Sequence, residues 1–194
     1  MRDAQFARAI NGALAPTFVL SIAMGRNTGA RRVSNAVFDA QRMSTVAKEA
    51  LPRDEWKRQT TCVTPLKRLP WYTAVLVGQL EPFDHALLII DQVVFEVPPE
   101  LAKLRRLAGE QRPVLEVPGH AFENDSEGFR ATLAAALSGW IDLRAFFSPS
   151  KHAIRADHDE YTTFFTWSTA KLVKVRRVLS KGGVRLVEYT AKSP

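Results

Sequence analysis

The sequence of 194 residues lacks the features that mark disulfide-rich, membrane-spanning and secreted proteins. Cys62 is the only cysteine, so an internal disulfide is excluded and a reducing compartment such as the cytoplasm is expected. No apolar run reaches the roughly 18 residues of a membrane-spanning helix. The run over 13–24 loosely imitates a signal peptide. Asp3 and Pro16 interrupt that pattern, so we expect the first element of a cytoplasmic protein, buried in its core.

The remaining composition is that of an ordinary folded domain. Apolar residues make up 46% of the chain and charged residues 24%, and 10 glycines and 11 prolines are too few for a collagenous or low-complexity chain. A chain of this length buries about two-thirds of its unfolded surface without disulfides. We expect one domain over 1–194, in which a basic, helix-containing N-terminal region (1–70) precedes a mixed α/β core (71–190).

Acidic residues are scarce at both ends of the sequence. Residues 1–70 carry 12 Lys and Arg against 5 Asp and Glu, and residues 168–194 carry 7 against 1, whereas residues 71–167 carry 8 against 14. Basic ends favour an anionic partner through long-range attraction, which salt screens within about 8–10 Å. The partner could be nucleic acid, an acidic protein face or an anionic membrane surface. Alternatively, the basic stretches are only solvated faces.

Apolar residues three and four positions apart predict four helices, over 33–51, 98–108, 126–139 and 169–181. Prolines open the second helix, and glycines end the last three. Ser168 is a suitable N-cap for the fourth helix. Asn124 and Glu127 have the spacing of a capping pair for the third.

Strand-forming residues predict seven strands, over 72–78, 85–97, 113–117, 141–147, 152–156, 161–167 and 184–189. The second of these is either one long strand or a hairpin around Asp91 and Gln92. Residues 52–70 are expected to be irregular, and residues 118–125 a polar loop. The final strand–helix–strand unit favours parallel strands with a right-handed crossover. The mixed order indicates an α/β or α+β domain with a small mixed sheet flanked by helices.

A polar run lies between two of the predicted strands: Asp157, His158, Asp159 and Glu160. In an extended segment Asp157 and Asp159 share one face. Two carboxylates and an imidazole could hold a divalent metal such as Mg²⁺, and His120 and Glu123, spaced H-x-x-E, could join from another loop. The alternatives are a solvated turn or a contact surface for a basic partner.

The predicted helix over 169–181 carries a basic stripe at spacings of three, three and four: Lys171, Lys174, Arg177 and Lys181. Its apolar positions fall on another face: Leu172, Val175 and Leu179. Lys174, Arg176 and Arg177 have no acidic neighbour on this helix. The stripe could contact phosphates or an acidic surface, each cation adding a salt-sensitive contribution. The alternative is an ordinary surface helix.

Two further candidate sites lie in the basic N-terminal region. The glycine-containing loop over 25–32 could cradle a phosphate through backbone N–H groups and Arg31 or Arg32, although it lacks the Walker A spacing. Trp56 and Trp71 flank the basic irregular stretch and could anchor a partner. Cys62 has no histidine near it in the sequence, so a nucleophilic thiol is not expected.

Two segments resemble a known family. Residues 127–146 resemble the strand–helix–strand box of ParB/sulfiredoxin-like domains; Gly128 and Arg130 match its pattern, and Phe129 stands where a second arginine is usual. Residues 157–166, in a basic protein of this size, resemble plasmid-borne fertility-inhibition proteins of the Osa and FiwA type. The resemblance implies a ParB/sulfiredoxin-like fold and suppression of conjugative DNA export by action on the coupling ATPase. It also implies hydrolysis of nucleotides or DNA, with Mg²⁺ and ATP as cofactors.

Two hypotheses from different classes follow. The first is a non-catalytic inhibitor that docks its basic ends on a component of the transfer machinery, with the coupling ATPase as the expected partner. The second is a metal-dependent enzyme acting on DNA or nucleotides, in which carboxylates hold Mg²⁺, a histidine moves protons and Arg130 steadies a phosphate. The residues assigned to the first two of these roles are Asp157, Asp159 and Glu160, then His158 or His120.

Overall fold

The computed structural model describes residues 17–19, 58–150 and 152–187, and in that part of the chain eight strands form one sheet. The strands are β1 (Thr17–Val19), β2 (Gln59–Val63), β3 (His85–Val93), β4 (Gly119–Glu123), β5 (Ile141–Ser148), β6 (His152–Ala156), β7 (Tyr161–Thr166) and β8 (Leu186–Val187). Their order across the sheet is β1-β4-β3-β5-β6-β7-β2-β8. β1 is parallel to β4 and the other neighbouring pairs are antiparallel, so the expected α/β domain with a mixed sheet is confirmed.

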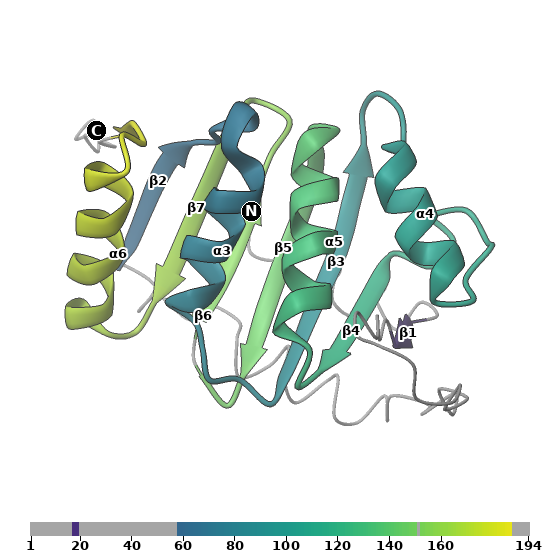
Figure 1. The fold of residues 1–194 in the computed structure, drawn as a ribbon, viewed down its shortest axis with the longest axis horizontal. Coiled ribbons are helices and arrows are strands. Elements are labelled where there is room, and N and C mark those ends of the chain that lie inside the picture. The colour runs from purple at the N-terminus through teal and green to yellow at the C-terminus, as the bar shows by residue number, and fades with distance from the viewer. Residues whose placement is uncertain (1–16, 20–57, 151, 188–194) are drawn as a thin grey trace, which may run out of the picture.

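The helices of the described residues lie together on one face of this sheet (Figure 1). They are η1 (Leu66–Arg68), α3 (Leu69–Gly78), α4 (Pro99–Leu107), α5 (Ser126–Ser138) and α6 (Thr169–Lys181). The largest buried apolar cluster fills the space between the two layers. At its centre the rings of Phe83, Phe122 and Phe147 each meet the ring of Phe129 edge-on, with centroids 5.0 to 6.1 Å apart. The core therefore includes the position where the resembled family has an arginine.

Most of the predicted elements in the described residues are confirmed. The helices expected over 98–108, 126–139 and 169–181 are α4, α5 and α6, and the strands expected over 141–147, 152–156 and 161–167 are β5, β6 and β7. The run over 85–97 contains one strand, β3, which ends at Val93 and has a bulge between Ile90 and Gln92 instead of a hairpin. The last strand begins at Leu186, two residues later than expected, and its predicted end at 188–189 lies outside the described residues, as does the predicted helix over 33–51.

The strand expected over 72–78 is wrong, because these residues belong to helix α3. The buried side chains of α3 have helical spacing: Leu69, Tyr72, Thr73, Leu76 and Val77. The opposite side of the helix is also apolar, with Ala74 and Val75, and this hides the periodicity in the sequence. A short apolar run of this kind does not distinguish a strand from a buried helix. Pro70, in the first turn, is the local signal that favours the helix.

The assignments over 113–125 are also wrong. The expected strand over 113–117 is a loop, and the expected polar loop contains β4. The buried guanidinium of Arg105 donates hydrogen bonds to the carbonyl oxygens of Arg112 and Val117, at 2.9 and 3.0 Å, so these groups do not need a neighbouring strand. The expected capping pair fails as well. Asp125 Oδ1 accepts from the N–H of Gly128 at 2.8 Å and is the N-cap of α5, while Asn124 has a φ of 50°.

β2 occupies an unexpected place. Residues 52–70 were expected to be irregular, but β2 lies between β7 and β8 and is antiparallel to both. Its register pairs Thr61 with Thr163, and their hydroxyl oxygens are 2.9 Å apart. Since β7 and β8 are both antiparallel to β2, they are parallel to each other, as the final strand–helix–strand unit predicts. They are not hydrogen-bonded neighbours, because β2 lies between them.

Candidate functional site

The predicted basic stripe lies on α6, at the edge of the domain. The hydroxyl of Ser168 accepts from the N–H of Lys171 at 3.2 Å and caps the helix, as expected. Val175 and Leu179 are buried against the domain, which leaves the basic side of the helix in solvent. Lys171 differs from the rest of the stripe, since its Nζ donates to the carbonyl oxygen of Gln79 at 2.6 Å and ties α6 to the end of α3. Three cations of the stripe are exposed: Lys174, Arg177 and Lys181.

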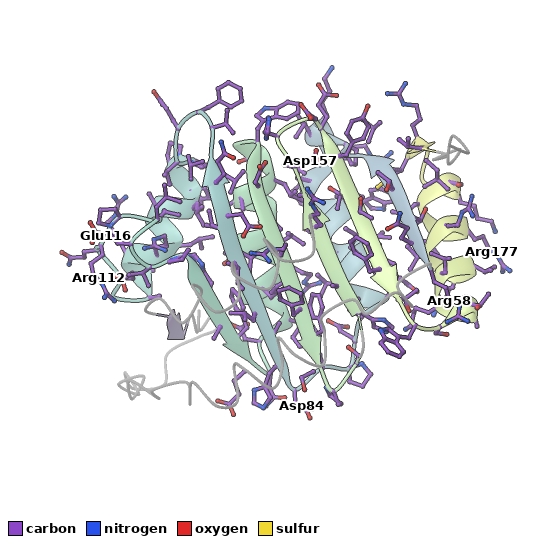
Figure 2. All side chains as sticks on the ribbon, turned by 180° about the vertical axis from the view of Figure 1, so that it is seen from behind. Arg58, Asp84, Arg112, Glu116, Asp157 and Arg177 are labelled. Carbon is purple, nitrogen blue, oxygen red and sulfur yellow. The ribbon has the colours of Figure 1, made fainter. Side chains whose placement is uncertain are left out.

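The stripe belongs to a larger basic surface, because two stretches of chain without Asp or Glu meet here: 58–70 and 168–187. Together they supply nine cations, which we call the basic end: Arg58, Lys67, Arg68, Lys171, Lys174, Arg176, Arg177, Lys181 and Arg185. Figure 2 shows Arg58 and Arg177 at this edge, and Arg112 and Glu116 at the opposite edge. No carboxylate of the described residues forms an ion pair with any of the nine. The charge of the basic end is therefore not neutralised within this part of the chain.

Trp71 lies in a junction that holds the basic end together. The guanidinium carbon of Arg68 is 4.1 Å from the centre of the Trp71 ring, and Arg68 Nη1 donates to the carbonyl oxygen of Gly182 at 2.7 Å. Gly182 lies directly against the same ring, where a Cβ atom on it would come within 2.1 Å of Trp71 Cη2. The end of α6 is thus fixed to η1 and α3. The expected partner contact by Trp71 stays a prediction, and this junction is its role inside the domain.

Gly182→Ala is expected to lower the free energy of unfolding by about 1–3 kcal/mol, because the added methyl group overpacks against Trp71. Gly78→Ala is the matched control: a Cβ there meets nothing within 4 Å, so this helical substitution should leave the stability unchanged or raise it by up to about 1 kcal/mol. Urea denaturation followed by tryptophan fluorescence measures both variants. Equal stabilities for the two variants would contradict the close packing of Gly182 on Trp71.

The polar run from Asp157 to Glu160 forms the turn between β6 and β7. Asp157 Oδ1 accepts from the N–H groups of Asp159 and Tyr161, at 3.2 and 3.1 Å. Glu160 has a φ of 71°, and its carbonyl oxygen accepts from the N–H of Thr64 at 2.8 Å. Asp157 therefore stabilises the turn through its side chain. Among the described residues, no group of three or more His, Cys, Asp or Glu is placed to hold a metal ion.

His158 in this turn has a partner that the sequence analysis missed. Asp142 Oδ1, on β5, lies 2.7 Å from the backbone nitrogen of His158 and 2.9 Å from its Nδ1. The hydrogen bond to Asp142 raises the pKa of His158 above 6.5, and the nearby charges of Asp142 and Asp159 add to the effect. The sequence signal for this pairing is weak: Asp142 is at the start of the predicted strand over 141–147, and His158 follows the end of the next predicted strand, over 152–156.

Asp142→Asn is expected to lower the pKa of His158 toward 6.5, and Asp159→Asn by less, because Asp159 Oδ1 is 3.9 Å from the His158 ring. A raised histidine pKa stabilises the folded state below pH 6.5, and this contribution disappears as the pH rises through the folded-state pKa. NMR titration of the histidine ring protons measures the pKa in the unaltered chain and in both variants. Equal shifts in the two variants would contradict the assignment to Asp142.

The remaining residues of the hydrolase hypothesis lie elsewhere in the domain. His120 is fully buried on β4, not in a loop, and burial beside Arg105 lowers its pKa to about 3. Glu123 is at the end of β4, paired in register with His85. That end of the sheet, marked by Asp84 in Figure 2, is opposite the end marked by Asp157. Arg130 lines a groove of about 540 Å³ on the helical layer, with Glu100 and Glu127. The structure therefore does not bring these groups together.

The metal-dependent hydrolase stays a prediction with a direct test. Asp157→Asn and Asp159→Asn should abolish hydrolysis of ATP or DNA by the purified protein in Mg²⁺ if these carboxylates hold the metal. Equal activity in the variants would assign the activity to a contaminant.

Two buried polar clusters were not found from the sequence. Arg105 Nη1 is 3.0 Å from His120 Nε2, and Glu110, which holds Arg112, lies nearby with its pKa lowered to about 2 by hydrogen bonds from Arg112. The sequence signal for this cluster is Arg105, a charged residue that stands beside Leu104 within the apolar stripe of α4. The second cluster joins Cys62 Sγ to the Tyr72 hydroxyl at 2.9 Å. Burial raises the pKa of Cys62 to about 11, which agrees with the expectation that this thiol is not a nucleophile.

Arg31, Arg32 and Trp56 lie outside the described residues, so their proposed contacts stay predictions. Comparison with models of known protein families, with curated proteins and with solved structures finds no match to this chain. The resemblance to fertility-inhibition proteins likewise stays a prediction. Within residues 17–19, 58–150 and 152–187, no helix is long and apolar enough to cross a membrane.

Proposed function

We propose that this protein is an inhibitor that binds an acidic face of a larger molecular machine through its basic end. The observation that carries the proposal is that two stretches of chain with nine cations and no Asp or Glu come together along α6, β2 and η1, and that no carboxylate of the described residues forms an ion pair with any of the nine. The resemblance to the Osa and FiwA proteins leads us to propose the coupling ATPase of a conjugative system as the partner. Inhibition would then follow from occupancy of the partner's surface.

The arrangement of the cations supports docking on another macromolecule. Lys174, Arg177 and Lys181 project from one side of a helix that is fixed at both ends, by Lys171 at its start and by the Arg68 junction at its end. A rigid helix presents its charges in a constant geometry, which reduces the ordering cost of binding. Unpaired cations also steer an acidic partner toward this edge over a distance that salt shortens.

Transfer of several conjugative plasmids, from donors with and without this protein, tests the proposal. We expect transfer of one class of plasmid to fall by several orders of magnitude while donor growth is unchanged. The purified chain should then bind the cytoplasmic part of the corresponding coupling ATPase, with an affinity that falls as salt is added. Binding to duplex DNA with no binding to the ATPase would overturn the proposal in favour of a nucleic-acid partner. Unchanged transfer of every plasmid would overturn the choice of partner.

A further inference from the structure

A pocket of about 380 Å³ lies between α4 and the loop that follows it. All of its lining residues belong to the stretch 97–114, which the structure describes completely. Arg112, one of them, is at the edge of the domain opposite Arg58 and Arg177 of the basic end (Figure 2). Small-molecule sites in proteins typically have volumes of about 300–1,000 Å³. We call this cavity the α4 pocket, and the proposed inhibition does not use it.

The wall of the α4 pocket has an excess of positive groups. Three guanidinium groups line it, those of Arg105, Arg106 and Arg112, against one carboxylate, that of Glu110. Arg105 and Glu110 are only 2% and 6% exposed, whereas Arg106 and Arg112 are exposed to solvent. Burial lowers the pKa of Arg105, so its surroundings disfavour the positive charge. An anion in the pocket would offset this cost.

Glu110 holds Arg112 in one orientation at the pocket. Its carboxylate accepts from Nε of Arg112 at 2.8 Å, from Nη2 of the same side chain, and from the backbone N–H of Arg112 at 2.9 Å. A guanidinium has five N–H groups, and those that Glu110 does not use have no hydrogen-bond partner among the described residues. Glu116, the other carboxylate that acts on Arg112, is not part of the pocket wall. Arg112 therefore has oriented donors available for a ligand.

Arg105 is also fixed in place. Its Nη1 donates to the carbonyl oxygen of Val117 at 3.0 Å, and its Nη2 donates to that of Arg112 at 2.9 Å. A cation that is already ordered attracts an anion without a further loss of side-chain entropy. Apolar side chains form another part of the wall: Val97, Ala102, Pro113 and Val114. The pocket thus has fixed positive charge beside an apolar surface, which fits a ligand with one anionic and one apolar part.

We propose that the α4 pocket binds a small organic anion in which a carboxylate or phosphate group is joined to a short apolar body. The anionic group would accept hydrogen bonds from Arg112 and be attracted by Arg105 and Arg106. Hydrogen bonds from guanidinium to an oxyanion are stronger than those between neutral groups. The apolar body would lie against Val97 and Val114. This site is at the opposite edge from the basic end, so its existence does not depend on the proposed inhibition.

NMR titration of the full-length, ¹⁵N-labelled chain tests the proposal. The probes are benzoate and phenyl phosphate, and the controls are benzamide, which has no charge, and inorganic phosphate, which has no apolar part. We expect one of the probes to shift the amide signals of residues 97–114 with a dissociation constant of at most about 1 mM. Each control should bind at least about tenfold more weakly than the probe that resembles it. The probe that binds more tightly identifies the anionic group.

A pair of charge reversals on α4 assigns the binding to the pocket. Arg106→Glu changes the pocket wall, and Lys103→Glu makes the same change three residues earlier, outside the wall. Both side chains are exposed, so both variants should fold. We expect Arg106→Glu to raise the dissociation constant at least about tenfold, and Lys103→Glu by no more than about twofold.

Four results would overturn the proposal. The first is that neither probe binds, and the second is that benzamide binds as tightly as benzoate. The third is that inorganic phosphate binds as tightly as phenyl phosphate, which would show a site for a free ion only. The fourth is an equal effect of Arg106→Glu and Lys103→Glu, which would show a response to overall charge.

Discussion

Replacement of Phe129 by alanine is expected to lower the free energy of unfolding by about 3–5 kcal/mol. The side chain is fully buried, and its ring meets those of Phe83, Phe122 and Phe147. Alanine removes the apolar surface of the ring and leaves a cavity that the edge-to-face neighbours cannot readily fill, since each is held by its own strand or loop. The loss is a large share of the 5–15 kcal/mol by which domains of this kind are usually stable.

Phe95→Ala is the matched control for this prediction. Phe95 is 68% exposed, so the same chemical change should alter stability by no more than about 0.5 kcal/mol. Urea denaturation followed by far-UV circular dichroism measures both variants against the unaltered chain. A small effect at Phe129, similar to that at Phe95, would contradict the packing of the aromatic cluster.

Reversal of three charges on α6 is expected to have the largest effect on function. The variant with Lys174→Glu, Arg177→Glu and Lys181→Glu should weaken binding to the acidic partner by at least about 100-fold, because like charges that face each other across an interface cost several kcal/mol. All three side chains are exposed, so the fold should survive. Plasmid transfer should return to the level of donors that lack the protein. Inhibition that persists in a well-folded triple variant would refute the role of the stripe.

A pair of double variants separates position from net charge. Lys174→Glu with Arg177→Glu and Lys103→Glu with Arg106→Glu change the same charge on cations three residues apart, the first pair on α6 and the second on α4. We expect only the α6 pair to reduce inhibition and to flatten the dependence of binding on salt. Equal losses would show that the partner responds to the overall charge of the protein.

The elements that the sequence predicted well are those whose signals are local. Helix α6 has its N-cap at Ser168 and glycines at its end, and its basic stripe is visible from spacing alone. The elements that it missed depend on distant residues. Tyr72 lies in a helix because α3 packs on more than one of its sides, so its apolar residues are not confined to one stripe. The loop after α4 is held by a single side chain, the guanidinium of Arg105. Neither effect leaves a periodic pattern in the sequence.

The same distinction between local signals and distant contacts applies to the candidate site. The cations of α6 could be named from the sequence, but their union with Arg58 and Arg68 depends on β2, which joins the sheet about 100 residues away from its partner β7. Phe129 gives the opposite lesson. The difference between Phe129 and the arginine of the resembled family was visible in the sequence, but its physical meaning, a core position in which a charge would have no partner, needed the fold.

The position of β2 also sets the timing of assembly during synthesis. Thr61 and Thr163 are paired on the neighbouring strands β2 and β7 but are 102 residues apart in the sequence. At a synthesis rate of roughly 5–20 residues per second, β2 therefore leaves the ribosome about 5–20 s before β7. β8, its neighbour on the other side, is made later still. Nascent β2 therefore has neither strand partner during this interval. A product that terminates before Tyr161 never acquires one, so such truncated chains should be targets for chaperones and proteases even though β3, β4 and β5 are complete.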